Sequence, residues 1–277
     1  MPVNPIPGRS AGRVSVCLPA RDEEETVGPI VAAIVRELVY GAGVVDEVVV
    51  VDDGSTDATA AAAADAGAVV VAAADVLPGV GPGTGKGEAL WKSLAVAAGD
   101  VLVFCDADLR EFDPAFVTGL LAPLDDPDIG LVKGYYLRPD GGGRVTELVA
   151  RPMIRLFFPD LAAIRQPLGG EFAARREVLE QVPFVQGYGV DLALLVDVAA
   201  RFGAGRIAQA DLGVRHHRNR SLDELGVQSV AVLRAALSRA GVPDREGWDP
   251  ADVAQRPPMA EVEEYRAARA GVGPAVI

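Results

Sequence analysis

The chain of 277 residues has only two cysteines, few aromatic residues and no long uninterrupted run of apolar residues. Cys17 and Cys105 both lie inside short apolar segments, which predicts reduced core thiols of a cytoplasmic protein rather than a disulfide framework. No apolar stretch reaches the ~20 residues of a membrane span. The N-terminal segment MPVNPIPGRSAGR also lacks the hydrophobic region of a signal peptide. We therefore expect a cytoplasmic protein with no membrane partner.

Positive charge is scarce as well. The 39 acidic residues outnumber the 26 basic ones, which gives a formal net charge of −13. Nucleic acids and anionic membranes are bound through a basic face, so this balance argues against both as general partners. A local phosphate site is still compatible with it, because a single basic cluster is enough for one small anion.

Aliphatic residues are abundant, since half of the chain is hydrophobic and aromatic residues make up only 5%. Such a composition suits a parallel sheet covered by helices. Apolar segments alternate with stretches of helical spacing, such as residues 27–38, over the first part of the chain. The first predicted strand, 14–18, ends at Pro19, and three more are expected in DEVVVV, AVVVAA and DVLVF. This alternation predicts an α/β protein with a doubly wound, mostly parallel sheet.

Beyond residue 132 the alternation loosens. The segment LVKGYYLRPDGGGRVTELVARP predicts a strand, a glycine-rich turn and the start of a helix. A loop and two helices are expected in QPLGGEFAARREVL and FVQGYGVDLALLVDVAARFG. From about Trp248 onward, prolines and charges predict a peripheral helix or a partly disordered segment.

Polar clusters follow three of the predicted strands: PARDEE, DDGSTD and DADLRE. Ligands of open α/β sheets bind beyond the carboxyl ends of the strands, so we expect these clusters to meet at one crevice. In the third cluster, Asp106 and Asp108 repel each other unless a cation or water offsets their charge. Both could reach one hard divalent cation that also takes substrate phosphates. The alternative is a solvated turn or a helix N-cap.

The cluster at 52–57 has a structural explanation for about half of its residues. Gly54 permits a tight turn, and Ser55, Thr56 and Asp57 would cap the helix that follows. The two aspartates at the end of an all-valine strand are harder to explain in this way. Their carboxylates are candidates to accept hydrogen bonds from a base N–H or from ribose hydroxyls.

Two further segments are candidate anion sites. GVGPGTGKGEALW fails the P-loop pattern, because that pattern requires glycine at position 80 and serine or threonine at 87, where the chain has Val80 and Gly87. A flexible loop remains, presenting Lys86 to a diphosphate or sugar, although such loops also occur without function. The second segment is RHHRNR, residues 215–220, which holds both histidines. It suits phosphate or a metal, or else is a solvated charged face.

Eight motifs, taken in order, make the chain resemble the glucosyl-3-phosphoglycerate synthases, which are retaining glycosyltransferases with a GT-A fold. The resemblance covers roughly residues 14–225, and it is specific because so many motifs occur in sequence. A strand, DDGS, a second strand and D-x-D alone would indicate only a nucleotide-sugar glycosyltransferase. The motifs are LPARDEEETV, VDDGSTDAT, GTGKGEALWKSL, CDADL, GRVTELVARP, PLGGEF, GYGVD and VRHHRNRSL.

The resemblance implies a GT-A, Rossmann-like α/β fold with a smaller C-terminal acceptor-binding part. The implied division is a flexible tail over 1–13, a nucleotide-sugar-binding part over 14–132, an acceptor-binding part over 133–225, and a C-terminal helical segment and tail over 226–277. UDP-glucose and 3-phosphoglycerate are the implied substrates, and Mg²⁺ or Mn²⁺ is the implied cofactor. The family habit also implies a homodimer.

Roles for individual residues follow from the same resemblance. Asp108 and His217 would hold the metal ion. Leu168, beside the anomeric carbon, would form the catalytic centre together with Asp191 and Lys86. The residues implied to bind the donor are Pro19, Ala20, Asp22, Glu23, Asp53, Ser55, Lys86, Asp106, Asp191 and Arg215. The residues implied to bind the acceptor are Arg144, Val145, Thr146 and Asn219.

Three positions depart from the family pattern. Asp22 stands where asparagine is more common, Ala107 where serine is, and Asp191 where glutamate is. Aspartate is one methylene shorter than glutamate, so the last change alters the reach of the carboxylate toward sugar hydroxyls.

The leading hypothesis from the sequence is metal-dependent transfer of glucose from UDP-glucose to the 2-hydroxyl of D-3-phosphoglycerate, with retention of configuration. Mannosyl transfer from GDP-mannose to the same acceptor is the near alternative. A sugar nucleotidyltransferase is more remote, since that class has a glycine-rich loop after its first strand, where this chain has PARDEE. A nucleotide-sugar sensor without turnover is the non-enzymatic alternative, and it would have no need of a second anion site.

Overall fold

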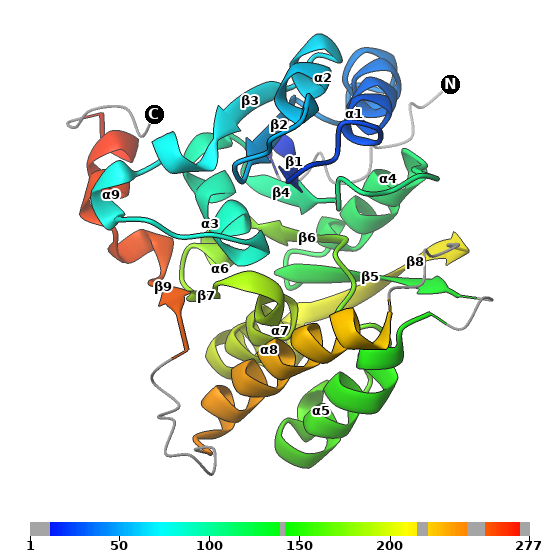
Figure 1. The fold of residues 1–277 in the computed structure, drawn as a ribbon, viewed down its shortest axis with the longest axis vertical. Helices are drawn as coiled ribbons and strands as arrows, with labels where there is room; N and C mark the ends of the chain where they lie inside the picture. The colour runs from blue at the N-terminus through cyan, green and yellow to red at the C-terminus, as the bar shows by residue number, and fades with distance from the viewer. Residues whose placement is uncertain (1–11, 139–141, 215–220, 243–252, 272–277) are drawn as a thin grey trace.

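A seven-stranded sheet runs through the centre of the computed structural model, with strand order β3-β2-β1-β4-β6-β5-β8 (Figure 1). The residues that the structure describes are 12–138, 142–214, 221–242 and 253–271. The strands of the sheet are β1 (Val14–Ala20), β2 (Glu47–Asp52), β3 (Val69–Ala72), β4 (Val101–Phe104), β5 (Leu131–Leu137), β6 (Phe172–Arg175) and β8 (Ile207–Val214).

The sheet is mostly parallel, as the alternation of segments predicts. Strands β3, β2, β1 and β4 are parallel neighbours, and β8 is parallel to β5. Only β6 runs antiparallel, between β4 and β5. Strand β6 was not predicted, because its four residues, FAAR, are too few to show a clear period.

Strand β1 is longer than predicted, since it continues through Pro19 to Ala20. Its pairing with β4 ends at Cys17, whereas its pairing with β2 continues to Ala20. Pro19 therefore lies where its missing N–H would have no β4 partner, which is the kind of position that a strand tolerates for proline. The extra residues carry β1 to the edge where the polar cluster begins.

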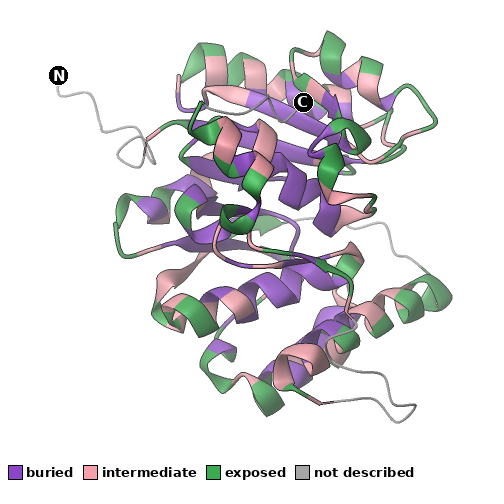
Figure 2. Cartoon of the chain, turned by 90° about the vertical axis from the view of Figure 1, so that its left-hand side faces the viewer, coloured by how far each residue is buried: buried purple, intermediate pink, exposed green. Residues whose placement is uncertain are grey.

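Helices cover both faces of the sheet, because successive strand residues point to opposite faces and both faces are apolar. One face packs against α1 (Val27–Ile34) with its continuation η2 (Val35–Gly41), α2 (Thr59–Asp65) and α4 (Ala115–Leu121). The other face packs against α3 (Lys86–Val96) and α7 (Val190–Phe202). Figure 2 shows the resulting layers, with buried residues on the strands and on the inward sides of the helices. The doubly wound arrangement is thus confirmed.

The remaining helices lie outside these two layers. Helices α5 and α8 pack together at the lower end of Figure 1, and α9 lies at its left edge, where the preceding η11 (Met259–Glu261) contacts α3. Their bounds, with the other small elements, are α5 (Arg151–Phe157), α6 (Arg176–Leu179), α8 (Leu222–Ala240), α9 (Glu263–Arg269), β7 (Phe184–Val185) and β9 (Gln255–Arg256). No helix within the described ranges is long and apolar enough to cross a membrane.

The C-terminal segment is more closely packed than its sequence suggests. Within 253–271, β9 pairs with β7, and Met259 and Tyr265 are buried in the core. The indole N–H of Trp91 in α3 donates to the carbonyl of Pro257, at 2.9 Å. A peripheral helix is present as α9, but the residues before it are part of the core.

The predicted division at residue 132 falls inside β5, whose residues continue to Leu137. Strands from both sides of that boundary join one sheet. The division into a donor-binding and an acceptor-binding part therefore stays a prediction about where each substrate binds, and it does not mark two separate sheets.

Both cysteines are free and fully buried. Burial raises the pKa of the Cys17 thiol to about 12. The thiolate is the reactive form, so Cys17 is an inert core residue.

Candidate active site

The polar clusters after β1, β2 and β4 meet at one cavity of about 860 Å³. Its wall includes 22–26 after β1, Asp57 after β2, and Asp106 with 108–111 after β4. The predicted convergence of the three clusters is confirmed. It follows from the parallel pairing of these strands, which brings their carboxyl ends to the same edge of the sheet.

Most of the predicted site residues line this cavity. Those in its wall are Asp22, Glu23, Lys86, Asp106, Asp108, Arg144, Val145, Thr146, Leu168 and Asp191. Four others, Pro19, Ala20, Asp53 and Ser55, lie in or directly after β1 and β2 but are not in its wall. Arg215, His217 and Asn219 lie outside the described residues.

Lys86 lies at the centre of the polar groups in the cavity wall. Its ammonium nitrogen is 3.0 Å from an oxygen of Asp106 and 3.1 Å from Oδ2 of Asp191. The other oxygen of Asp191 lies 3.0 Å from the ammonium of Lys133. Both carboxylate oxygens of Asp191 are therefore held by lysines, which fixes the orientation of a side chain that is only 7% exposed.

The protonation of the two lysines follows from burial and from these carboxylates. Burial disfavours the charged form of Lys86, but the charges of Asp106 and Asp191 outweigh it and hold the pKa of Lys86 above the usual lysine range. For Lys133 burial dominates and lowers the pKa, although Asp191 opposes the shift. The carboxylate of Glu171 adds negative charge near both lysines. Lys86 is thus a permanent cation at neutral pH.

Two glycines make this geometry possible. Gly85, with φ +87°, directly precedes α3 and turns the chain so that Lys86 begins the helix. A Cβ at Gly170 would lie 2.1 Å from a carboxylate oxygen of Asp106. Any side chain at that position would displace Asp106, so the glycine pair of PLGGEF serves the site by leaving room.

Asp53 acts on the loop before Lys86. Its carboxylate accepts a hydrogen bond from the Gly85 amide at 2.8 Å, and Arg21 lies 3.7 Å away. Partial burial raises the pKa of Asp53, against the hydrogen bond from Gly85. A donor contact by Asp53 stays a prediction, whereas its hold on the glycine-rich loop is a feature of this structure.

The turns after β1 and β2 are joined by hydrogen bonds. The amide of Asp22 donates to the Ser55 hydroxyl at 3.0 Å, and the Asp22 carboxylate accepts from the Thr56 amide at 2.7 Å. Asp22 adopts φ +55°, a left-handed conformation that aspartate tolerates better than most residues. Asp22 and Ser55 therefore join the two turns beside the cavity, and their role in donor binding stays a prediction.

The fit of the described residues to a metal ion can be tested from their chemistry. They contain no group of three or more His, Cys, Asp or Glu side chains that could hold an ion alone. Asp108 is exposed and lines the cavity, while Asp106 next to it is already bound by Lys86. A hard cation needs oxygen ligands, so these residues fit an ion completed by the phosphates of a donor and by water. The contribution of His217 stays a prediction.

Basic residues also line the cavity, among the residues that are predicted to bind the acceptor. Arg144 and Val145 form the helical turn before η6 (Thr146–Ala150), and all three of Arg144, Val145 and Thr146 line the wall. Arg138, just after β5, joins them. Positive charge at these positions suits an acceptor that carries a phosphate and a carboxylate.

Sequence reasoning missed Lys133 and Arg138. Lys133 is a lone lysine inside the apolar segment LVKGYY, and a buried charge in a central strand requires a partner, which was the available signal. Arg138 directly follows the carboxyl end of β5, the position where ligand contacts of such sheets gather.

Comparison with known proteins gives consistent results. Residues 15–188 match glycosyl transferase family 2. The glucosyl-3-phosphoglycerate synthase of Mycolicibacterium smegmatis is 51% identical over 84% of this chain and 80% of its own length. That of Petrotoga mobilis is 44% identical over 82% of this chain and 73% of its own length.

Solved structures agree with the sequence comparison. The glucosyl-3-phosphoglycerate synthase of Mycobacterium tuberculosis, solved with Mn²⁺, UDP-glucose and phosphoglyceric acid, is 45% identical, covers 91% of this chain and 92% of its own, and has a TM-score of 0.83. The same enzyme, with Mn²⁺, UDP and glucosyl-3-phosphoglycerate, also has a TM-score of 0.83. The GT-A-like fold is therefore confirmed. With this coverage and identity, the chain belongs to the glucosyl-3-phosphoglycerate synthases of glycosyl transferase family 2.

Proposed function

We propose that the protein transfers glucose from UDP-glucose to the 2-hydroxyl of D-3-phosphoglycerate, with the help of Mg²⁺ or Mn²⁺ and with retention of configuration. The observation that carries this proposal is one cavity whose wall contains both the Lys86–Asp191 ion pair and the cations of Arg138 and Arg144. A transferase requires both substrates in one space, and the relatives that share this fold bind these substrates.

The donor end suits a sugar attached to a diphosphate. Lys86, fixed between Asp106 and Asp191, offers a permanent cation to phosphate or sugar oxygens. The lone pairs of Asp191 that the lysines leave open would accept hydrogen bonds from sugar hydroxyls. Asp22, Glu23 and the β1–β2 turns would enclose the uridine. Arg215 would face the donor phosphates.

Departure of UDP places negative charge on the diphosphate, and the site is built to offset it. A divalent ion held by Asp108, His217 and the diphosphate would act as a Lewis acid toward the leaving group. Lys86 adds a fixed positive charge nearby, which needs no reorganisation during the reaction. A diphosphate stabilised in this way leaves without a strong protein acid.

Retention would follow if the acceptor attacks from the side of the departing phosphate. Asp191 is an unsuitable covalent nucleophile, because both of its oxygens are held by lysine ammonium groups. The leaving phosphate would then take the proton of the acceptor hydroxyl. The backbone carbonyl of Leu168, in the cavity wall, would lie beside the anomeric carbon and stabilise its developing positive charge.

The proposal is tested by a panel of donors and acceptors with the purified protein. UDP release is expected only when UDP-glucose, 3-phosphoglycerate and Mg²⁺ or Mn²⁺ are all present. Faster turnover with GDP-mannose would change the donor assignment, and turnover undiminished by excess EDTA would remove the metal from the reaction. Pyrophosphate formation from UTP and glucose 1-phosphate would indicate a nucleotidyltransferase instead.

Replacement of Arg144 with alanine is expected to raise the KM for 3-phosphoglycerate by about tenfold or more, since a charge-assisted contact is worth about 1.5–3 kcal/mol. The KM for UDP-glucose should stay within about twofold. Arg110→Ala is the matched control, because Arg110 also lines the cavity but is exposed and paired with Glu25. Equal effects of Arg144→Ala on both KM values would move this residue out of the acceptor site.

Lys133 gives the reaction an expected pH dependence. Its cation holds Asp191, and its pKa is lowered, so the cation is lost as the pH rises toward the ordinary lysine range. We expect kcat/KM for UDP-glucose to fall on this alkaline side in the wild-type protein. Lys133→Met should lack that alkaline decline and show about tenfold lower kcat/KM already at neutral pH. An unchanged alkaline limb in Lys133→Met would assign the decline to another group.

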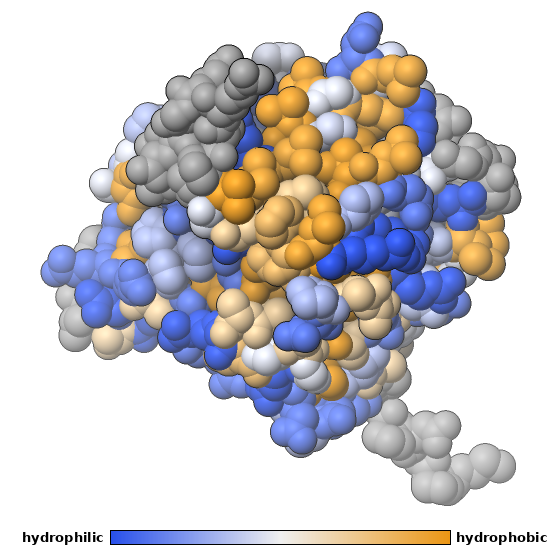
Figure 3. Space-filling model, turned by 90° about the horizontal axis from the view of Figure 1, so that it is seen from below, coloured by the Kyte–Doolittle hydropathy of each residue, from blue (hydrophilic) through white to orange (hydrophobic). Residues whose placement is uncertain are grey.

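We further propose a homodimer formed at the end of the molecule where η6, α5 and α8 pack together. Large apolar side chains are exposed there, and Figure 3, which views this end, shows apolar residues gathered on it. Extended apolar patches usually mark an interface. The exposed residues are Leu148, Leu156, Phe157, Leu222, Val227 and Val230. Sedimentation should show a dimer for the wild type and a monomer for Leu156→Glu; a monomeric wild type would contradict this.

The cytoplasm is the proposed compartment. Cys17 and Cys105 are both free and buried, as expected where thiols are kept reduced.

A further inference from the structure

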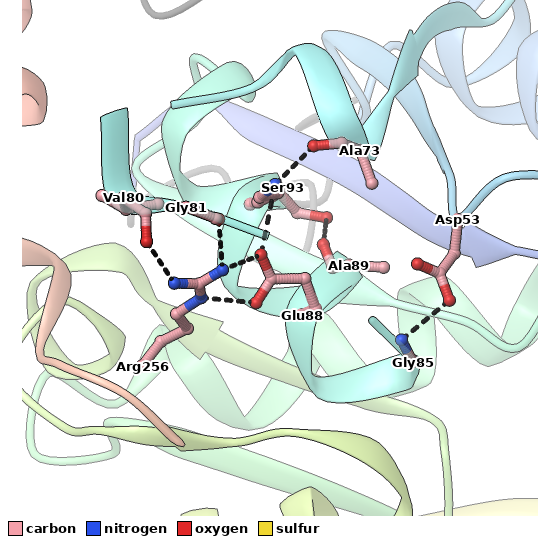
Figure 4. A network of polar contacts seen from close by, with 10 residues as sticks. Asp53, Ala73, Val80, Gly81, Gly85, Glu88, Ala89, Ser93 and Arg256 are labelled. Atoms are coloured by element: carbon pink, nitrogen blue, oxygen red, sulfur yellow. Dashed lines mark hydrogen bonds and ion pairs between the residues drawn. The ribbon is translucent and has the colours of Figure 1, made fainter. Parts of the chain in front are cut away.

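The C-terminal strand β9 places an arginine against the glycine-rich loop that precedes Lys86. The guanidinium of Arg256 donates to both carboxylate oxygens of Glu88, at 2.6 and 2.8 Å. It also donates to the carbonyls of Val80 and Gly81, each at 2.8 Å (Figure 4). Arg256 is only 8% exposed and Glu88 is fully buried. A bidentate pair of this kind is rigid as well as strong.

This arginine holds the loop through contacts outside the cavity wall, since Arg256 is not among the residues that line the cavity. The loop runs from the short helix η4 (Pro78–Val80) to α3 and turns at Gly81 and Gly85, both with positive φ. Residues 81–84 belong to no helix or strand. Arg256 binds its carbonyls near the start, and Asp53 binds the Gly85 amide at its end. A Cβ at Gly83 would lie 2.5 Å from the Arg256 guanidinium, so the loop lies directly on the pair. Lys86 directly follows Gly85, the last residue of the loop.

The same strand supports the turn that leads to Asp191. Strand β9 pairs with β7, and the amide of Gln186 donates to the carbonyl of Ala254 at 2.9 Å. The turn η8 (Gly187–Gly189) follows and runs into α7, which carries Asp191 near its start. The two turns also touch, since a Cβ at Gly85 would lie 3.2 Å from the Cα of Gly187. Strand β9 therefore contacts the segment before Lys86 and the segment before Asp191.

We propose that Arg256 is a positioning residue for the donor end of the site. It acts through Glu88 and the glycine-rich loop to hold Lys86 at the distance where its ammonium contacts Asp106 and Asp191. The proposal rests on the proposed function for the role of Lys86, and on the structure for the link between Arg256 and the loop. An arginine that only stabilised the fold would affect donor and acceptor kinetics alike, whereas a positioning residue affects the donor side.

The test compares Arg256→Lys and Arg256→Met with Arg239→Met. Lysine keeps the charge but loses the fork that reaches Glu88 and two carbonyls. Arg239 is the matched control, because it binds the largely buried Asp197 and also reaches Gln255, beside Arg256, without touching the loop. The melting temperatures of all three variants are measured as well, so that a loss of activity can be distinguished from a general loss of stability.

We expect Arg256→Met to lower kcat/KM for UDP-glucose by about 20- to 100-fold, because small displacements of a positioned group cost rates of this size. Arg256→Lys should lie between this variant and the wild type. The KM for 3-phosphoglycerate should change by less than about twofold in both, and Arg239→Met should keep all constants within about twofold at a comparable melting temperature. Donor and acceptor constants that fall together, or an Arg256→Lys enzyme equal to the wild type, would overturn the proposal.

Hydrogen exchange provides a readout that does not depend on turnover. In Arg256→Lys, the amides of 79–90 should exchange faster than in the wild type, while those of 143–150, at the acceptor end, should not change. Unchanged exchange over 79–90 would overturn the link between Arg256 and the loop. If the amides of 79–90 exchange faster in Arg256→Lys but the wild-type enzyme does not turn over 3-phosphoglycerate, the link between Arg256 and the loop stands. The proposed function would then be refuted instead.

Discussion

Replacement of Asp108 with alanine is expected to lower kcat by about a thousandfold or more, while the protein stays folded. The carboxylate is exposed to the cavity just beyond the end of β4, so it contributes little to the core. Its proposed task is to hold the divalent ion against the diphosphate. A Lewis acid supplies several kcal/mol of charge stabilisation in the transition state, and each 1.36 kcal/mol is a factor of ten in rate. Loss of about 4 kcal/mol gives the expected decrease.

The measurement is kcat at saturating substrates over a titration of Mn²⁺, with Mn²⁺ binding in the presence of UDP followed by electron paramagnetic resonance. Glu111→Ala is the control, since Glu111 is another exposed carboxylate in the wall of the same cavity. We expect Glu111→Ala to behave like the wild type and Asp108→Ala to lose Mn²⁺ affinity as well as rate. Normal Mn²⁺ binding in Asp108→Ala would place the ion elsewhere.

The sequence allowed much of the N-terminal part of the fold to be predicted, for a physical reason. Strands β1, β2 and β4 are buried on both faces, so each is a continuous apolar run, and the polar residues after each run mark its carboxyl end. Parallel pairing then brings these ends together without any further information. Asp22, Asp57 and Asp108 could be placed near one another on this basis alone, whereas Lys86 was assigned to the site by the glycine-rich loop and the family resemblance.

The parts that could not be predicted depend on contacts between distant segments. Strand β6 has only four residues and takes its place from its two neighbours rather than from a pattern of its own. Lys133 is explained only by Asp191, 58 residues later in the chain. Arg256 is explained only by Glu88, 168 residues earlier. A charged residue in a sequence is expected at the solvent-exposed surface. Its burial can be explained only when the residue that pairs with it is known.

Such pairs also show how the site is stabilised. The three carboxylates of Asp106, Asp191 and Glu171 lie around Lys86 and Lys133. The two lysines offset two of these three negative charges, so one remains before any cation or substrate binds. A divalent cation near Asp108 would offset more of it, which gives a physical reason for metal and donor to bind together.

Replacement of Lys86 with methionine is therefore expected to affect stability and activity together. Methionine keeps much of the apolar stem but leaves Asp106 and Asp191 without the ammonium that lies 3.0 and 3.1 Å from them. Breaking a buried pair by removing one partner costs about 3–5 kcal/mol, an upper range here because Lys86 and Asp106 are partly accessible from the cavity. We expect a clear decrease in melting temperature. We also expect kcat to fall by about a hundredfold or more, since Lys86 would no longer stabilise the leaving diphosphate.

The control variant should lower the stability of the protein without changing the contacts in the active site. Arg176→Met serves this purpose, because Arg176 is a buried cation whose guanidinium donates to the carbonyls of Leu94, Ala97 and Gly99 near the opposite end of α3. Kinetics at a temperature where both variants are folded, checked by circular dichroism, separate the two effects. Arg176→Met should keep kcat within about threefold of the wild type. A Lys86→Met enzyme that is no slower than Arg176→Met would show that Lys86 only supports the fold, and the developing charge on the diphosphate would then have to be offset by the cation and the arginines alone.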